Sequence, residues 1–225
     1  MIQPAHALTL DLNGQTRVLI HKAIIAGWTG RDREALEKHI RELEELGVAR
    51  PASTPIFYRV SASRLTTEPE IEVCDLSSSG EVEFVLLRHS GRLWVGIGSD
   101  HTDRQVETYN ITVSKQMCDK PIGSHFWDYA DVKAHWDKLV LRSFITENGQ
   151  RVLYQEGSIA AMLSPEDLLS HWNAPFDDGS LMFCGTLAAR GGIRPSSRFE
   201  FELVDSVAGR TLSHAYNMVT LPVLG

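Results

Sequence analysis

Cysteine, basic residues and long apolar runs are all scarce in this sequence of 225 residues. The cysteines are Cys74, Cys118 and Cys184, and an odd number at scattered positions argues against a disulfide framework. We therefore expect free thiols and a cytoplasmic protein. The 22 Lys and Arg residues are outnumbered by 29 Asp and Glu residues, which gives a net charge of −7. No nucleic acid is expected as a partner, because the basic surface that would bind phosphates is absent.

The apolar runs are too short for a membrane span. The run FVLL at residues 84–87 is typical, and about 20 apolar residues are needed to cross a bilayer. The first residues, MIQPAHALTLDL, lack the basic and apolar segments of a signal peptide. No membrane is therefore expected as a partner. The hydrophobic content of 43% is enough for a core that needs no disulfide or metal to hold it together.

The first part of the chain has the pattern of a hairpin followed by a helix. Alternating apolar residues flank Asn13-Gly14, a dipeptide typical of tight hairpin turns. A helix is predicted after Asp32, which can cap its start, and Gly47 is expected to end it. The apolar residues that repeat at helical spacing are Leu36, Ile40, Leu43 and Leu46. Residues 48–60, VARPASTPIFYRV, have the composition of a proline-rich connector.

From about residue 70 the chain has the pattern of short strands. The expected strands are at residues 70–73, 81–89, 92–99, 139–146, 150–157, 180–186, 198–205 and 214–222. A short helix is predicted at residues 164–172, with Ser164 as cap and Pro165 in its first turn. The fold class is α+β and predominantly β. We expect an N-terminal hairpin plus helix segment at residues 1–54 and a β-rich domain at residues 55–225, the alternative being one compact unit.

Three carboxylates occupy unusual places in one predicted hairpin, EVEFVLLRHSGRLWVGIGSD. If Ser90-Gly91 is a two-residue turn, Glu81 lies opposite Asp100, and Glu83 shares the face of Glu81. Opposed side chains have Cβ atoms about 5 Å apart, and like charges there destabilise a sheet. A divalent cation is a natural counter-charge, and an all-oxygen set suits Mg²⁺ or Mn²⁺, with Ca²⁺ also possible.

Two other interpretations of these acids stay open at this point. Glu81 and Glu83 could line the solvated face of an amphipathic strand, which is the usual place of alternating glutamates. A three-residue turn would also shift the register by one residue and move Asp100 to the other face.

Several segments, in this order, resemble the fumarylacetoacetate hydrolase superfamily of metal-dependent enzymes. EVEFVLL resembles the family's E-x-E strand, SDHTDR its N-D-x-[ST]-x-R segment, and Ser114-Lys115 its G-K pair. The strand, Asn-Gly turn, strand and helix of residues 139–169 follow, and DDGSLMFCGTLAARGGI resembles the G-D-x-[IL]-x-x-G-T-P-x-G-x-G loop. The resemblance covers roughly residues 70–222. It implies a mixed β-roll, a fumarylacetoacetate-hydrolase-like catalytic domain at residues 55–225, and a homodimer.

The resemblance also implies roles for individual residues. Its metal ligands correspond to Glu81, Glu83 and Asp100. Its substrate-binding positions correspond to Arg104, Lys115 and Thr186, the threonine holding a carboxylate, and Tyr58 is a candidate for the rim of the site. The alternatives are that Lys115 is merely solvated and that the loop around Tyr58 only packs on the core. Leu187 stands where the family has the proline of its G-T-P motif.

The implied activity is a divalent-metal-dependent hydrolase that cleaves a C–C bond in a small 2-oxo acid or β-dicarbonyl acid through a metal-stabilised enolate. Related hydrolases carry a lid histidine, and residues 56–65, IFYRVSASRL, contain none. His101 and His125 are therefore candidate bases, with Lys115 as a further catalytic group, although surface positions are the usual place of such histidines. The alternatives are a lyase or isomerase acting on the same substrate class and a non-catalytic binding protein.

Overall fold

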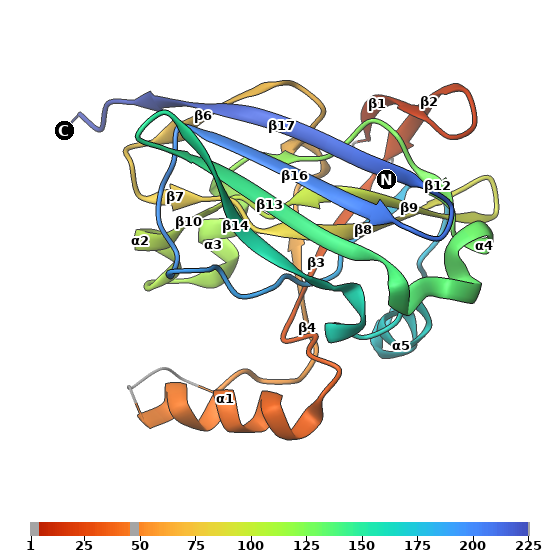
Figure 1. Cartoon of the computed structure of the whole chain (residues 1–225), viewed down its shortest axis with the longest axis horizontal. Helices are drawn as coiled ribbons and strands as arrows, with labels where there is room; N and C mark the ends of the chain where they lie inside the picture. Colours follow the sequence, from red (N-terminus) through yellow and green to blue (C-terminus); the bar gives the residue numbers. More distant parts are fainter. Residues whose placement is uncertain (1–4, 46–49, 225) are drawn as a thin grey trace.

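A computed structural model describes residues 5–45 and 50–224, and most of its regular structure is β (Figure 1). A six-stranded mixed sheet has the order β12-β9-β8-β15-β3-β4. Its strands are β12 (Trp127–Asp128), β9 (Arg92–Ser99), β8 (Val82–His89), β15 (Ser180–Phe183), β3 (Lys22–Gly27) and β4 (Ile56–Val60). A five-stranded sheet has the order β14-β13-β16-β17-β6. Its strands are β14 (Gln150–Ser158), β13 (Val140–Glu147), β16 (Arg198–Asp205), β17 (Arg210–Leu221) and β6 (Glu70–Cys74).

Three small sheets and short helices complete the described fold. The small sheets pair β1 (His6–Asp11) with β2 (Gln15–Ile20), β5 (Leu65–Thr66) with β11 (Lys120–Pro121), and β7 (Ser78–Ser79) with β10 (Thr102–Asp103). The α-helices are α1 (Arg33–Glu45), α2 (Arg104–Glu107), α3 (Ile111–Met117), α4 (Tyr129–Val132) and α5 (Pro165–His171). The 3₁₀ helices are η1 (Ala62–Arg64), η2 (Lys133–Lys138) and η3 (Ile159–Ala161). None of the described helices is long and apolar enough to cross a membrane.

The β8–β9 hairpin has the register that the sequence predicts. Ser90 and Gly91 have φ angles of 52° and 71°, and two positive φ values in a two-residue turn are the mark of type I′. His89 therefore pairs with Arg92, and the same register continues along both strands. Beyond the last ladder pair, the backbone N–H of Asp100 donates to the Glu81 carbonyl at 3.0 Å. Glu81 and Asp100 are thus opposed, as the two-residue turn requires.

Strand β8 is buried on both of its faces. Phe84 and Leu86 belong to the main core, which lies between the two large sheets, whereas Val85 and Leu87 belong to a second core beneath the β1–β2 hairpin. Burial on both faces explains why this strand is almost continuously apolar rather than alternating. Because side chains alternate along a strand, Glu83 projects on the same face as Val85 and Leu87, away from the five-stranded sheet.

Both predicted helices are present with their predicted caps. The Asp32 carboxylate accepts from the backbone N–H groups of Glu34 and Ala35 at the start of α1. Ser164 accepts from the N–H of Asp167 in α5. Leu46 and Gly47, the predicted end of α1, lie outside the described residues. Figure 1 shows α1 standing apart from the two sheets.

Two parts of the sequence were assigned wrongly. The proline-rich connector contains β4, which pairs with β3 along its whole length. Helices α2 and α3 occupy a segment for which no helix was predicted.

The division at residue 54 stays a prediction. Strand β3 of the first segment lies between β15 and β4 of the second, which favours the alternative of one unit. The cysteines are free, as predicted, with Cys118 and Cys184 buried.

The turn offers a test of what sets the register. Ser90→Asn should raise the free energy of unfolding by roughly 0.5 kcal/mol, because asparagine adopts a positive φ more readily than serine. Ser90→Val should lower it, since a β-branched residue is strained there. Urea unfolding followed by circular dichroism measures both changes. Equal midpoints for the three proteins would show that the turn conformation contributes nothing to stability.

Candidate metal centre

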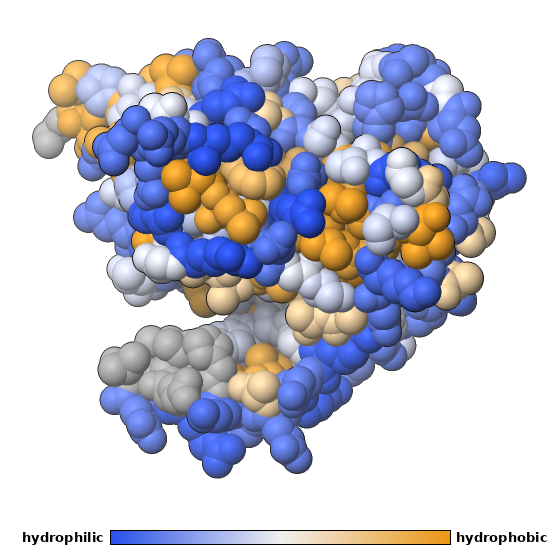
Figure 2. All heavy atoms as spheres, in the orientation of Figure 1, coloured by the Kyte–Doolittle hydropathy of each residue, from blue (hydrophilic) through white to orange (hydrophobic). Residues whose placement is uncertain are grey.

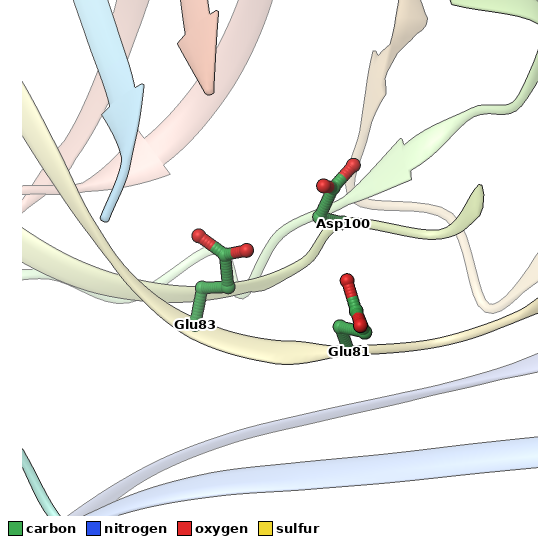
Figure 3. A group of neighbouring side chains, drawn as sticks. All are labelled: Glu81, Glu83 and Asp100. Carbon is green, nitrogen blue, oxygen red and sulfur yellow. The ribbon is translucent and has the colours of Figure 1, made fainter. Parts of the chain in front are cut away.

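Three carboxylates meet at the open end of the β8–β9 hairpin. One oxygen each from Glu81, Glu83 and Asp100 lies within 4.8 Å of the other two (Figure 3). The hairpin register brings them together: Glu81 and Asp100 oppose each other, and Glu83 is two residues along the same strand. This is the arrangement that the sequence predicted for the three acids.

Asp100 is fully buried between two lysines. Lys115 Nζ, from α3, donates to its Oδ2 atom, and Lys120 Nζ, from β11, lies 3.2 Å from its Oδ1 atom. Burial alone would raise the pKa of Asp100, but the two ammonium groups outweigh burial and hold the pKa at about 2. Burial lowers the pKa of Lys120, and the charge of Asp100 opposes that shift. Asp100 is therefore an ionised carboxylate.

Glu83 is in the opposite situation: the charge of Lys115 favours its ionised form, but among the described residues no cationic side chain forms an ion pair with it. It is only 2% exposed, and its Oε2 atom accepts from the Gly185 N–H at 2.6 Å. Burial and then the charge of Asp100 raise the pKa of Glu83 well above its ordinary value. A buried carboxylate of this kind is costly unless a cation completes its surroundings.

Glu81 is balanced by Arg104. Arg104 Nη2 lies 3.2 Å from Glu81 Oε1, while Nη1 donates to Glu107 at 2.9 Å and Nε to Ser79 at 2.7 Å. Burial raises the pKa of Glu81, and Arg104 opposes this effect. Arg104 is thus occupied by carboxylates on two sides.

The three acids fit a hard divalent cation. All the donors are carboxylate oxygens, the ligand type that Mg²⁺, Mn²⁺ and Ca²⁺ prefer. Ligands about 2.0–2.6 Å from one ion lie at most about 4–5 Å apart, and the three oxygens are within 4.8 Å of one another. A cation there would also supply the charge that Glu83 lacks.

A cavity of about 680 Å³ opens beside the acids and contains part of the predicted site. Tyr58, Lys115 and Thr186 line it together with Glu81, Glu83 and Asp100. Lys115 Nζ also lies 5.9 Å from the centre of the Tyr58 ring. Figure 2 shows the molecule hollowed between α1 and the sheets, and Ala35 of α1 lines this cavity.

Three predicted site residues do not line this cavity. Arg104 pairs with Glu81, which lines the cavity, but is not itself on the lining. His101 is fully buried with its Nδ1 atom 2.8 Å from the Tyr216 hydroxyl, and burial followed by the charge of Lys120 lowers its pKa to about 3. His125 is exposed, with Nε2 3.5 Å from Asp11. The roles given to these two histidines therefore stay predictions with no cavity contact to support them.

Thr186 is held by two hydrogen bonds before any substrate arrives. Its hydroxyl donates to the Val82 carbonyl at 2.8 Å and accepts from Gln155 Nε2 at 2.8 Å. Because a hydroxyl has only one proton, donation to a substrate carboxylate would require release of Val82. The predicted role of Thr186 therefore requires an exchange of hydrogen bonds.

The sequence did not single out Lys120, Gln155 or Gly185. The Gln155 amide accepts from the Val82 N–H at 3.0 Å, so it fixes the backbone between Glu81 and Glu83. Gly185 has a φ of +100°, and a Cβ there would lie 1.8 Å from Thr29 Oγ1, so only glycine can bring its N–H to Glu83. Gly185 lies in the quoted loop motif, which could have drawn attention to it, whereas nothing in the sequence around Lys120 or Gln155 indicates a site.

The fold is shared with solved structures of the fumarylacetoacetate hydrolase family. Fumarylacetoacetate hydrolase from Exiguobacterium antarcticum is 15% identical with a TM-score of 0.64, covering 94% of this chain and 83% of that one. A yeast protein of that family is 19% identical with a TM-score of 0.62, covering 91% and 95%. A 2-keto-3-deoxy-D-arabinonate dehydratase complexed with magnesium and 2,5-dioxopentanoate is 16% identical with a TM-score of 0.65, covering 95% and 79%. The predicted fold class is thereby confirmed.

The sequence itself identifies the family more narrowly. No curated protein matches it. The family model described as "Protein of unknown function (DUF2848)" matches residues 26–216, which is most of the chain. This chain belongs to the DUF2848 family.

Proposed function

We propose that this chain is a divalent-metal-dependent hydrolase that cleaves a C–C bond in a small 2-oxo acid or β-dicarbonyl acid. The observation that carries the proposal is Glu83, a buried carboxylate that forms no ion pair with a described cationic side chain, next to two further acids on the wall of a large cavity. The dehydratase structure with magnesium and 2,5-dioxopentanoate supports it, because a protein of the same fold holds that metal with an oxo acid. A homodimer, which the resemblance implies, is part of the proposal.

Glu81, Glu83 and Asp100 would hold Mg²⁺ or Mn²⁺, with Ca²⁺ as the alternative. When bound, such a cation would act as a Lewis acid toward the carbonyl oxygens of the substrate. The carboxylates orient the site for it: Asp100 is fixed by two lysines, Glu83 by the Gly185 N–H, and Glu81 by Arg104.

Lys115 would supply the positive charge that the chain itself directs into the cavity. Burial lowers the pKa of Lys115, but Asp100 and Glu81 outweigh burial and raise the pKa above its ordinary value, so the side chain stays protonated. A fixed ammonium group next to the acids would stabilise the negative charge that develops on the substrate as an enolate forms. This role matches the substrate contact that the resemblance implies for Lys115.

One observation favours a lyase or isomerase as the second candidate. Hydrolysis requires a group that activates water, and neither His101 nor His125 lines the cavity, so a metal-bound hydroxide would have to supply the base. Decarboxylation, dehydration and tautomerisation also need a stabilised enolate but no hydrolytic water. A non-catalytic protein in which the three acids bind nothing is less favoured, since Glu83 would then only reduce stability.

Replacing Glu83 should strongly weaken metal binding. Glu83→Gln removes one of three carboxylates, so the Kd for Mn²⁺ should rise at least about 100-fold in isothermal titration calorimetry. Glu72→Gln, on the exposed edge of β6, is the matched control and should bind as the wild type does. If Glu83→Gln binds Mn²⁺ with unchanged affinity, the three acids are not the metal site.

The metal-free protein should gain stability from the same replacement, and the gain should depend on pH. A raised pKa means that folded Glu83 binds its proton more tightly than in the unfolded chain. Above the ordinary value of 4.5, the contribution of Glu83 to the free energy of unfolding therefore decreases with pH, by on the order of 1 kcal/mol per pH unit, until the raised pKa is passed. Urea unfolding in EDTA should show Glu83→Gln more stable than the wild type at pH 8 and nearly equal at pH 4.5. A difference independent of pH would show that Glu83 ionises normally.

Isotope labelling separates hydrolysis from the alternative reactions. With a 2,4-dioxo acid as substrate in ¹⁸O-labelled water, hydrolysis places one solvent oxygen in the new carboxylate, which mass spectrometry detects. A lyase or isomerase forms no such carboxylate. Products must be analysed early, because ketone oxygens exchange with water on their own.

A further inference from the structure

The charge on the cavity wall is confined to one part of it. Among the residues that the structure describes, every charged one on the lining comes from the β8–β9 hairpin, including its ends, or from α2 and α3. The other main lining segments, at residues 25–30, 161–162 and 185–188, contain no charged residue. A ligand whose polar end lies at the three acids would therefore place its other end against neutral wall.

The cations around the site leave none for a second anionic group. Lys115 is the only described cationic residue on the lining, and it is paired with Asp100. Lys120 is fully buried against the same carboxylate, and Arg104 is held between Glu81 and Glu107. A carboxylate at the far end of a substrate would lose part of its hydration without gaining a partner from the described residues, which costs affinity.

The charge balance agrees with a single carboxylate on the substrate. With all carboxylates ionised, as cation binding requires, the four acids Glu81, Glu83, Asp100 and Glu107 face three cations, which leaves one negative charge in excess. A divalent cation would change this to one positive charge. One substrate carboxylate would neutralise the site, whereas two would make it negative again.

The neutral wall contains an aromatic residue in an unusual backbone conformation. Trp28 lines the cavity just after β3 with a φ of 55°, which is rare for a bulky residue. Such conformations persist only where the surroundings enforce them, and they gather at functional sites. Ile111 from α3 and Leu187 from the loop after β15 add apolar surface. An aromatic or branched alkyl group would make favourable contacts with this wall.

We infer that the substrate is a 2-oxo acid or 2,4-dioxo acid with one carboxylate and an uncharged apolar group at its other end, and that Trp28 determines this specificity. The inference rests on the proposed function and narrows its substrate class. It excludes dicarboxylic oxo acids as good substrates.

Three ligands with one common head group test it. They are 2,4-dioxopentanoate, 4-phenyl-2,4-dioxobutanoate and 2,4-dioxopentanedioate, which carry a methyl group, a phenyl group and a carboxylate at the same carbon. Their affinities for the Mg²⁺-loaded protein are measured by titration calorimetry, and turnover is followed where it occurs. The phenyl compound should bind at least about tenfold more tightly than the dicarboxylate. Equal or tighter binding of the dicarboxylate overturns the inference but leaves the proposed function standing. No binding of any of the three overturns both.

Two variants then assign the specificity to the wall. Trp28→Ala should weaken binding of the phenyl compound about tenfold and change that of the methyl compound little. Tyr109→Ala, an exposed aromatic residue off the cavity, is its control. If Trp28→Ala weakens the phenyl and methyl compounds equally, Trp28 does not determine specificity.

Ala188→Lys places a cation on the neutral wall and should improve binding of the dicarboxylate about tenfold, while Ala208→Lys, in the β16–β17 turn, should not.

Discussion

The buried ion cluster of Asp100 with Lys115 and Lys120 is the interaction on which the site depends. It joins the end of β9 to α3 and β11, three segments that are separate in the sequence. Removing one member of a buried ion cluster leaves an uncompensated charge, which is strongly destabilising. The cluster therefore fixes where the β8–β9 hairpin ends and where α3 presents Lys115 to the cavity.

Glu83 shows how stability and function are opposed in the same few residues. Its neighbour Asp100 pairs with both lysines, and Glu83 itself forms no ion pair with a cationic side chain among the described residues. A protein selected only for stability would place an apolar residue at this buried strand position. A carboxylate at this position is stabilised when a cation binds beside it. Functional sites commonly contain residues that lower the stability of the folded protein.

The part of the site that could be predicted follows from local rules. The two-residue turn at Ser90-Gly91 determines the register, and the register determines which carboxylates share a face.

The positions of the histidines could not be predicted as reliably. His101 follows Asp100 directly, and alternation directs it to the opposite face, where it contacts Tyr216 instead of the cavity. The backbone amide of Gly185 and the side chains of Lys120 and Gln155 reach the site only through tertiary packing, which no local pattern reveals. Strand β4 was missed for a related reason, because prolines before residue 56 suggested a loop where pairing with β3 continues the sheet.

Under the proposed function, the arrangement would separate the chemistry of the site from its substrate selectivity. The hairpin and helices α2 and α3 supply all the charge, so they can orient the polar head of a substrate and stabilise negative charge. The segments after β3 and β15 supply neutral surface. Gly185 and Thr186 in the second segment hold Glu83 and the Val82 carbonyl, whereas Leu187 and Ala188 line the cavity without a hydrogen bond from their side chains to the acids. Differences in substrate between proteins of this fold would then arise mainly at such neutral positions. Leu187 fits this view, because an apolar residue extends the neutral wall at the position where the resembling motif has proline.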